Sequence, residues 1–131
     1  MSGPQILIID DSEDDVLLAA AYISRWIRGA GFRRVESGSE LASALNEHTW
    51  DLVLCDHNMP GFDSIGALEM VRKSSASLPF FVYSGDFSRA QTADALESGA
   101  DGVLEKRDTP GLLRVIDAAL GGNPRPTPLM A

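Results

Sequence analysis

Five side chains suited to chemistry directly follow apolar runs of strand length in this sequence. In chain order they are Asp10, Asp11, Asp56, Ser84 and Lys106. In an open parallel α/β sheet, ligands bind at the carboxyl ends of the strands, so these residues are expected to meet at one edge of the sheet. Three carboxylates, a hydroxyl and an ammonium group in one crevice are suited to binding a cation together with an anionic reactant.

The three aspartates predict a site for a divalent metal ion. Clustered carboxylates repel one another strongly in a partly desolvated crevice unless a cation neutralises them. Mg²⁺ is expected, because it binds through one or two carboxylates and completes an octahedral shell with water and phosphate oxygens. Zn²⁺ is not expected, because Cys55 and His57 lie in one short segment without a second pair of ligands at metal spacing.

The same residues predict phosphoryl chemistry at Asp56. A carboxylate beside Mg²⁺ can attack phosphorus once its own charge and that of the phosphoryl group are screened. Lys106 would then be the counter-ion, and Ser84 would donate a hydrogen bond to a phosphoryl oxygen. Each residue alone is more simply explained as a loop acid, a turn hydroxyl or a surface charge, but their joint placement at strand ends favours a site.

The elements that must position these side chains alternate regularly along the chain. Apolar runs alternate with segments whose apolar residues recur every three or four positions, which predicts an α/β fold with a five-stranded parallel sheet. Runs that are almost entirely apolar are expected to be central strands, and they are Ile6 to Ile9, Leu52 to Cys55 and Phe80 to Tyr83. The more polar Arg33 to Glu36 and the short Gly102 to Leu104 are expected at the edges.

Five helices are expected to connect and follow these strands. Their predicted ranges are Val16 to Arg28, Glu40 to Glu47, Ser64 to Lys73, Arg89 to Glu97 and Pro110 to Leu120. The expected N-caps include Ser12, Asp63, Ser88 and Thr109. The first helix is predicted to present a broad apolar stripe that includes Leu17 and Ala21.

Composition and charge restrict the class of protein. A chain of 131 residues fits one domain, expected over residues 1–120, with a flexible tail rich in Pro and Gly over 121–131. The formal net charge of −8 argues against binding to nucleic acid. No apolar run approaches the roughly 18 to 20 residues that cross a bilayer. The start lacks the features of a secretory signal, and Cys55 is the only cysteine, so a cytoplasmic protein is expected.

Four motifs resemble those of response-regulator receiver domains. They are Ile8-Ile9-Asp10-Asp11, Leu54-Cys55-Asp56-His57-Asn58-Met59-Pro60-Gly61, Val82-Tyr83-Ser84-Gly85 and Gly99-Ala100-Asp101-Gly102-Val103-Leu104-Glu105-Lys106. The resemblance covers about residues 5 to 120. It implies a flavodoxin-like or CheY-like fold of the doubly wound (βα)5 type, in a stand-alone signalling switch.

The resemblance also implies a role for each site residue. Asp11 and Asp56 would contact Mg²⁺ directly, and Asp10 would act mainly through water. Asn58 would supply its backbone carbonyl to the metal ion. Members of the family take a phosphoryl group from a histidine kinase or a phosphotransfer protein and hydrolyse their own phosphoaspartate.

Two positions depart from the pattern of the family. Arg107 follows Lys106 where the family usually has a proline, so the turn between the last strand and the last helix is expected to differ. Val103 occupies a position that is commonly aromatic, so an output through a rotating aromatic side chain is not expected. Movement of the Ser84 hydroxyl could still favour one of two loop arrangements.

Two other functions stay open from the sequence. The first is a receiver-like module that binds partners without regulated phosphorylation. The second is a phosphatase of the haloacid-dehalogenase type, which has its two aspartates as Asp-x-Asp after the first strand, whereas Asp10 and Asp11 are adjacent. Under the preferred interpretation the chain acts through contacts with an unknown downstream protein or as a homodimer.

Overall fold

In the computed structural model, which describes residues 3–57, 59, 61–85 and 89–120, five strands and five helices alternate along the chain. The strands are β1 (Gln5–Ile9), β2 (Gly31–Val35), β3 (Leu52–Asp56), β4 (Phe80–Ser84) and β5 (Gly102–Glu105). The helices are α1 (Glu13–Trp26), α2 (Gly38–Glu47), α3 (Ser64–Ser74), α4 (Arg89–Glu97) and α5 (Thr109–Ala119). The strands are parallel and lie in the order β2-β1-β3-β4-β5. The predicted α/β class is therefore confirmed.

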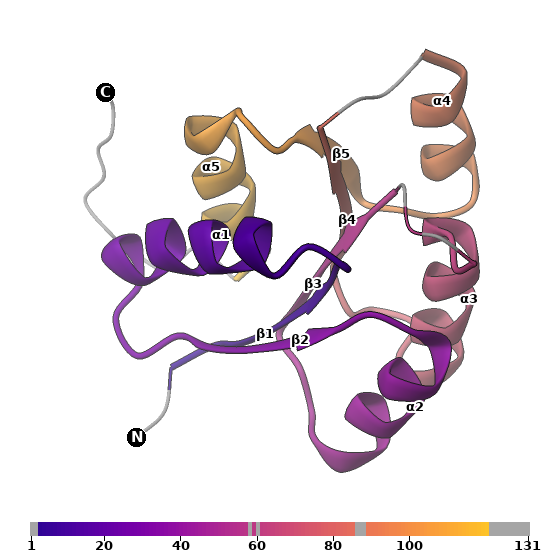
Figure 1. Ribbon diagram of the computed structural model, residues 1–131, viewed down its shortest axis with the longest axis horizontal. Helices are drawn as coiled ribbons and strands as arrows, with labels where there is room; N and C mark the ends of the chain where they lie inside the picture. The colour runs from indigo at the N-terminus through magenta and orange to yellow at the C-terminus, as the bar shows by residue number, and fades with distance from the viewer. Residues whose placement is uncertain (1–2, 58, 60, 86–88, 121–131) are drawn as a thin grey trace.

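Helices cover both faces of the sheet. Helices α1 and α5 lie on one face, and α2, α3 and α4 lie on the other (Figure 1). Each face carries its own buried apolar cluster, because alternate strand residues point to opposite sides: Ile6 and Ile8 pack on the side of α1, whereas Leu7 and Ile9 pack on the side of α2 and α3. The strands predicted to be central, β1, β3 and β4, occupy the middle of the sheet, and β2 and β5 form its edges.

Most helix ends lie within one residue of the predicted positions, but α1 begins three residues before the predicted Val16 and ends two before the predicted Arg28, and α2 begins two residues before the predicted Glu40. The hydroxyl of Ser12 accepts the backbone N–H of Asp15, and the carboxylate of Asp63 accepts that of Gly66, so both are N-caps as expected. The prediction of Thr109 as the cap of α5 is wrong. Asp108 is the N-cap, because its carboxylate accepts the N–H of Gly111, and Thr109 is the first helical residue. The predicted cap Ser88 and the tail 121–131 lie outside the described residues.

The buried face of α1 is narrower than the sequence predicts. Val16, Ala19 and Ile23 are buried against the sheet, whereas the side chain of Leu17 is 61% exposed and Ala21 is also exposed. Leu17 and Ala21 lie one helical turn apart on the outer side of the helix, so these two apolar residues do not belong to the core. Among the described residues, no helix is long and apolar enough to span a membrane.

The two faces of α1 predict different responses to truncation. Ile23→Ala should lower the free energy of unfolding by about 2–5 kcal/mol, because it leaves a cavity at a fully buried position. Leu17→Ala removes a side chain of similar size from the exposed face and should change the free energy by less than about 0.5 kcal/mol. Urea unfolding measures both, and equal losses would contradict this placement of α1.

Candidate phosphoryl-transfer site

The carboxyl edge of the sheet brings the predicted residues together. Asp10 follows β1, Asp56 ends β3, Ser84 ends β4 and Lys106 follows β5. Asp10, Asp11 and Asp56 each place a carboxylate oxygen within 4.8 Å of the others. Parallel pairing of neighbouring strands produces this convergence, since it aligns their carboxyl ends.

Asp10 is held by protein groups on both carboxylate oxygens, although it is completely buried. Its Oδ1 accepts the backbone N–H of Ser12 at 2.9 Å. Its Oδ2 accepts the hydroxyl of Tyr83 at 2.8 Å and lies 2.9 Å from Nζ of Lys106. These contacts offset the loss of water that would otherwise disfavour a buried charge.

Lys106 is shared among three carboxylates. Its Nζ lies 2.7 Å from Oδ2 of Asp15, 2.9 Å from Oδ2 of Asp10 and 3.3 Å from Oδ2 of Asp56. Burial alone would lower the pKa of Lys106, but hydrogen bonds to Asp15 and Asp10 and the charges of Asp10 and Asp56 outweigh it and raise the pKa above its ordinary value. The ammonium group therefore stays protonated in the neutral pH range.

Asp15 is a member of the site that the sequence interpretation missed. Its backbone N–H donates to the hydroxyl of Ser12 at the cap of α1. Its carboxylate makes the shortest of the Lys106 contacts and is 44% exposed. The sequence offers no local signal for this contact, because Asp15 lies in the first turn of α1 and Lys106 is 91 positions away.

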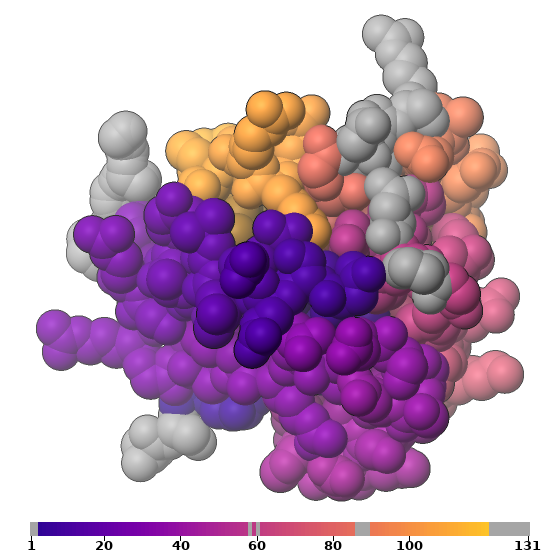
Figure 2. All heavy atoms as spheres, in the orientation of Figure 1, coloured from indigo at the N-terminus to yellow at the C-terminus, as the bar shows by residue number. Residues whose placement is uncertain are grey.

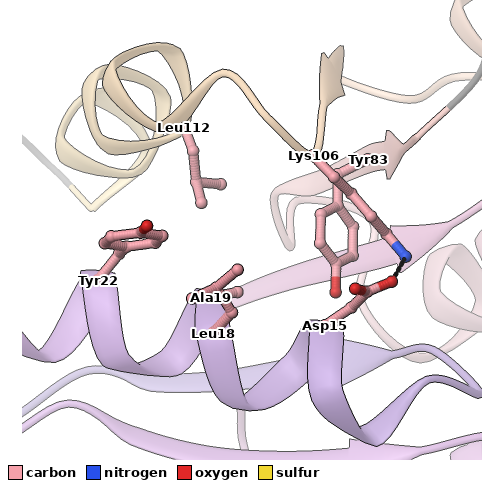
Figure 3. Close-up of a pocket in the computed structure, with 7 residues that line it drawn as sticks. All are labelled: Asp15, Leu18, Ala19, Tyr22, Tyr83, Lys106 and Leu112. Atoms are coloured by element: carbon pink, nitrogen blue, oxygen red, sulfur yellow. Dashed lines mark hydrogen bonds and ion pairs between the residues drawn. The ribbon is translucent and has the colours of Figure 1, made fainter.

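Tyr83 is the second residue that was missed. Side chains alternate along a strand, so Tyr83 points toward α1 and α5 while Ser84 points to the other face. Figure 3 shows its ring beside Lys106 and its hydroxyl directed to the start of α1, and Nζ of Lys106 lies 5.1 Å from the ring centroid. Burial and the charge of Asp10 raise the pKa of the Tyr83 hydroxyl, so it remains a proton donor.

A small hollow borders this network between α1 and α5 (Figure 3). Its volume is about 30 Å³, and it is lined by Asp15, Leu18, Ala19, Tyr22, Tyr83, Lys106 and Leu112. A space of this size holds about one or two water molecules. The hollow therefore gives water access to Asp15 and Lys106 but has no room for a larger ligand.

The other predicted site residues have different surroundings. Ser84 is buried at the end of β4, and its carbonyl accepts the backbone N–H of Lys106 at 2.9 Å, which ties the ends of β4 and β5 together. Val103 is partly buried against the cluster on the α3 side. Asn58, predicted to offer a backbone carbonyl to the metal ion, lies outside the described residues.

His57 and Cys55, the residues on either side of Asp56, both contact the rest of the domain. Nδ1 of His57 lies 2.7 Å from the hydroxyl of Ser64, the buried first residue of α3, so His57 holds the segment after β3 against that helix. Cys55 is fully buried in β3, and burial raises the pKa of its thiol well above the ordinary value. Its thiol is therefore protonated and unsuited to metal binding.

The donor set at this edge fits a hard divalent cation. Asp10 and Asp56 are buried and Asp11 is exposed, so the cluster opens to solvent on one side. The ammonium group of Lys106 contacts three carboxylates, those of Asp10, Asp15 and Asp56, and Asp11 adds a fourth to the cluster. This leaves negative charge that a divalent cation would neutralise. Oxygen donors with an open, hydrated side suit Mg²⁺ better than softer metals.

Comparison with known proteins identifies the family to which this arrangement corresponds. The family model for the response regulator receiver domain matches residues 6–117. The chain belongs to the response regulator receiver domain family. This family is a class of signalling switches, and the predicted resemblance is confirmed over all five strands.

Receiver domains in much longer proteins are also similar to this chain. It is 31% identical over 109 residues to the sensor protein GacS of Pseudomonas syringae pv. syringae, a match that covers 79% of this chain and 12% of that protein. It is 29% identical over 117 residues to the transcriptional regulatory protein ZraR of Salmonella typhimurium strain LT2, covering 88% of this chain and 26% of ZraR. The chain thus spans about a quarter or less of these relatives.

A solved structure supports the fold assignment. The receiver domain of the sensor histidine kinase PA1611 from Pseudomonas aeruginosa PAO1 superposes with a TM-score of 0.79 at 19% identity, over 92% of this chain and 99% of that one. That structure has a magnesium ion coordinated in its active site cleft. The likeness shows that both chains share the receiver fold.

The hydrogen bond between Tyr83 and Asp10 can be tested by removing one hydroxyl. Tyr83→Phe should lower the free energy of unfolding by about 1–3 kcal/mol, because buried Asp10 loses a donor. Tyr22→Phe is the matched control, since Tyr22 borders the same hollow and its hydroxyl makes no hydrogen bond within the described part of the chain. If urea unfolding gives both variants the stability of the native protein, the contact does not hold Asp10.

Proposed function

We propose that this receiver domain accepts a phosphoryl group on Asp56 and signals through the conformational change that follows. One observation carries the proposal: a carboxylate at a strand end lies beside two further carboxylates and 3.3 Å from the ammonium group of Lys106. This combination supplies a nucleophile, ligands for a cation and a counter-ion for the transferred group.

The reaction with a small acyl phosphate balances without net proton transfer. A carboxylate oxygen of Asp56 forms a bond to phosphorus, the bond between phosphorus and the acyl oxygen breaks, and the carboxylate of the donor leaves with the electron pair. With a phosphohistidine donor, the bond between phosphorus and nitrogen breaks, and the imidazole leaves with the electron pair and takes a proton from solvent water. Lys106 binds one oxygen of the incoming phosphoryl group, and Ser84 donates a hydrogen bond to another.

Asp11 and Asp56 are the proposed direct ligands of Mg²⁺, with Asp10 acting through water and Asn58 through its backbone carbonyl. When bound, Mg²⁺ neutralises the carboxylates and screens the charge of the phosphoryl group. Asp10 fits an indirect role, because Ser12, Tyr83 and Lys106 already occupy both of its oxygens. Water that reaches phosphorus in the same site would hydrolyse the phosphoaspartate and reset the switch.

The proposed donor is a histidine kinase or a phosphotransfer protein, and the proposed output is a contact with another protein or with a second copy of this chain. The formal charge of −8 repels the nucleic-acid backbone, so no direct contact with nucleic acid is proposed. Such a system operates in the cytoplasm, where both phosphodonors and Mg²⁺ are available. The family assignment removes the support for a haloacid-dehalogenase phosphatase.

Intact mass measures the proposed modification directly. After incubation with Mg²⁺ and acetyl phosphate, the native protein should gain the mass of one phosphoryl group, and removal of Mg²⁺ with EDTA should abolish the gain. Asp56→Asn should show no gain, because the amide is not a nucleophile toward phosphorus under these conditions.

Two results would oppose this function. A gain of the same size in Asp56→Asn would place the acceptor elsewhere. No gain in the native protein, either from acetyl phosphate or from a panel of purified histidine kinases, would favour a receiver-like module that binds partners without phosphorylation.

A further inference from the structure

We propose that Asp15 is a positioning residue that holds the ammonium group of Lys106 away from Asp56 in the resting protein and releases it to the incoming phosphoryl group. The inference rests on the proposed phosphorylation of Asp56. It begins from the unequal contacts of Lys106, whose Nζ lies 2.7 Å from Asp15 but 3.3 Å from Asp56. In this state the ammonium group is closer to a helix residue than to the acceptor.

The carboxylates compete for the N–H donors of Lys106, because these donors are few. An ammonium group has three protons, and three carboxylates already surround Nζ of Lys106. A phosphoryl group on Asp56 adds oxygens that need the same donor. A phosphoryl oxygen can replace the contact to Asp56, and a second contact to the phosphoryl group requires Lys106 to give up Asp10 or Asp15.

Asp15 is the carboxylate that can be released at least cost. Asp10 is completely buried, so losing Lys106 would leave its charge poorly compensated in the interior. The carboxylate of Asp15 is 44% exposed and borders the hollow between α1 and α5, so water can replace the ammonium group there. Burial thus decides which contact breaks.

The first turn of α1 fixes Asp15 in the holding position. Ser12 donates its backbone N–H to Asp10, and its hydroxyl accepts the N–H of Asp15, so the cap ties the site to the helix. Figure 2 shows the start of α1, in indigo, on the molecular surface near α5, in orange. Release of Lys106 therefore changes the charge balance at an exposed helix end.

The test compares two variants that remove the same charge from the same turn. Asp15→Asn removes the carboxylate that contacts Lys106, whereas Asp14→Asn removes an exposed neighbour that makes no contact with Lys106. Both amides preserve side-chain size and the backbone of the cap. Asp15→Glu restores the charge on a side chain that is one methylene longer.

Affinity for beryllofluoride in the presence of Mg²⁺ is the first measurement, because this phosphoryl analogue binds without a transfer reaction and can be followed by ¹⁹F NMR. The initial rate of phosphorylation by acetyl phosphate is the second. Both the affinity for beryllofluoride and the initial rate should be about two- to fivefold higher in Asp15→Asn than in Asp14→Asn, because the free energy of a partly exposed ion pair corresponds to a factor of that size. Asp15→Glu should return both toward the native values.

The outcomes separate this inference from the proposed function. If the native protein gains a phosphoryl group but Asp15→Asn equals Asp14→Asn, or falls below it, the holding role of Asp15 is wrong and phosphorylation stands. If the native protein gains no phosphoryl group and binds no beryllofluoride, the proposed function is wrong, and the role of Asp15 that rests on it is wrong as well. Should Asp15→Asn fail to fold, Asp15→Ser, whose side chain is too short to reach Lys106, replaces it in both measurements.

Discussion

The structure depends on the repulsion among carboxylates at the carboxyl edge of the sheet. Asp10, Asp11 and Asp56 place oxygens within 4.8 Å of one another, and Asp15 adds a fourth negative charge through its contact with Lys106. Negative charges at such distances repel one another unless positive charge lies between them. The ammonium group of Lys106 supplies part of that charge, and a divalent cation would supply the rest.

This constraint explains why the site is built from backbone-fixed positions rather than from mobile loops. Asp56 ends a buried central strand, and the backbone N–H of Lys106 donates to the carbonyl of Ser84, so the proposed acceptor and its proposed counter-ion are held by paired strands. Asp10 is held by the cap of α1 and by the hydroxyl of Tyr83. Pre-organised contacts reduce the rearrangement needed at the moment of transfer.

The same constraint bears on how the domain could signal. The position that often carries a rotating aromatic side chain is Val103, packed on the α3 side of the sheet. Hydrogen bonds within the described site connect Asp10 and Lys106 to the first turn of α1. A change at Asp56 would therefore alter contacts on the α1 side as well as at the end of β4.

Much of the fold and part of the site could be predicted from the sequence. The central strands could be predicted because a strand buried on both faces is a continuous apolar run. The meeting of Asp10, Asp56, Ser84 and Lys106 could be predicted because each lies at or just after the end of a parallel strand. The exposure of Leu17 could not be predicted, since an apolar residue on the outer face of a helix looks like a core residue. Contacts between side chains that are far apart in the sequence could not be predicted either.

Tyr83 and Asp15 illustrate that limit. Tyr83 reaches Asp10 across 73 positions and Lys106 reaches Asp15 across 91. The strands concerned are not neighbours, and each pair meets because the parallel strands all end at the same edge of the sheet. Asp108 shows a smaller failure of the same kind, because both Asp108 and Thr109 are good N-caps and only the backbone decides between them. Local preference alone did not distinguish the two.

The most direct measurement of the central claim is urea unfolding of the native protein and Asp56→Asn, each in EDTA and in Mg²⁺. If carboxylate repulsion governs the site, Asp56→Asn is the more stable protein in EDTA. The native protein then gains about 2.7 kcal/mol from Mg²⁺ at a concentration 100 times its Kd, and the variant gains less. A native protein that is the more stable in EDTA, or that gains no more than the variant from Mg²⁺, would contradict the account.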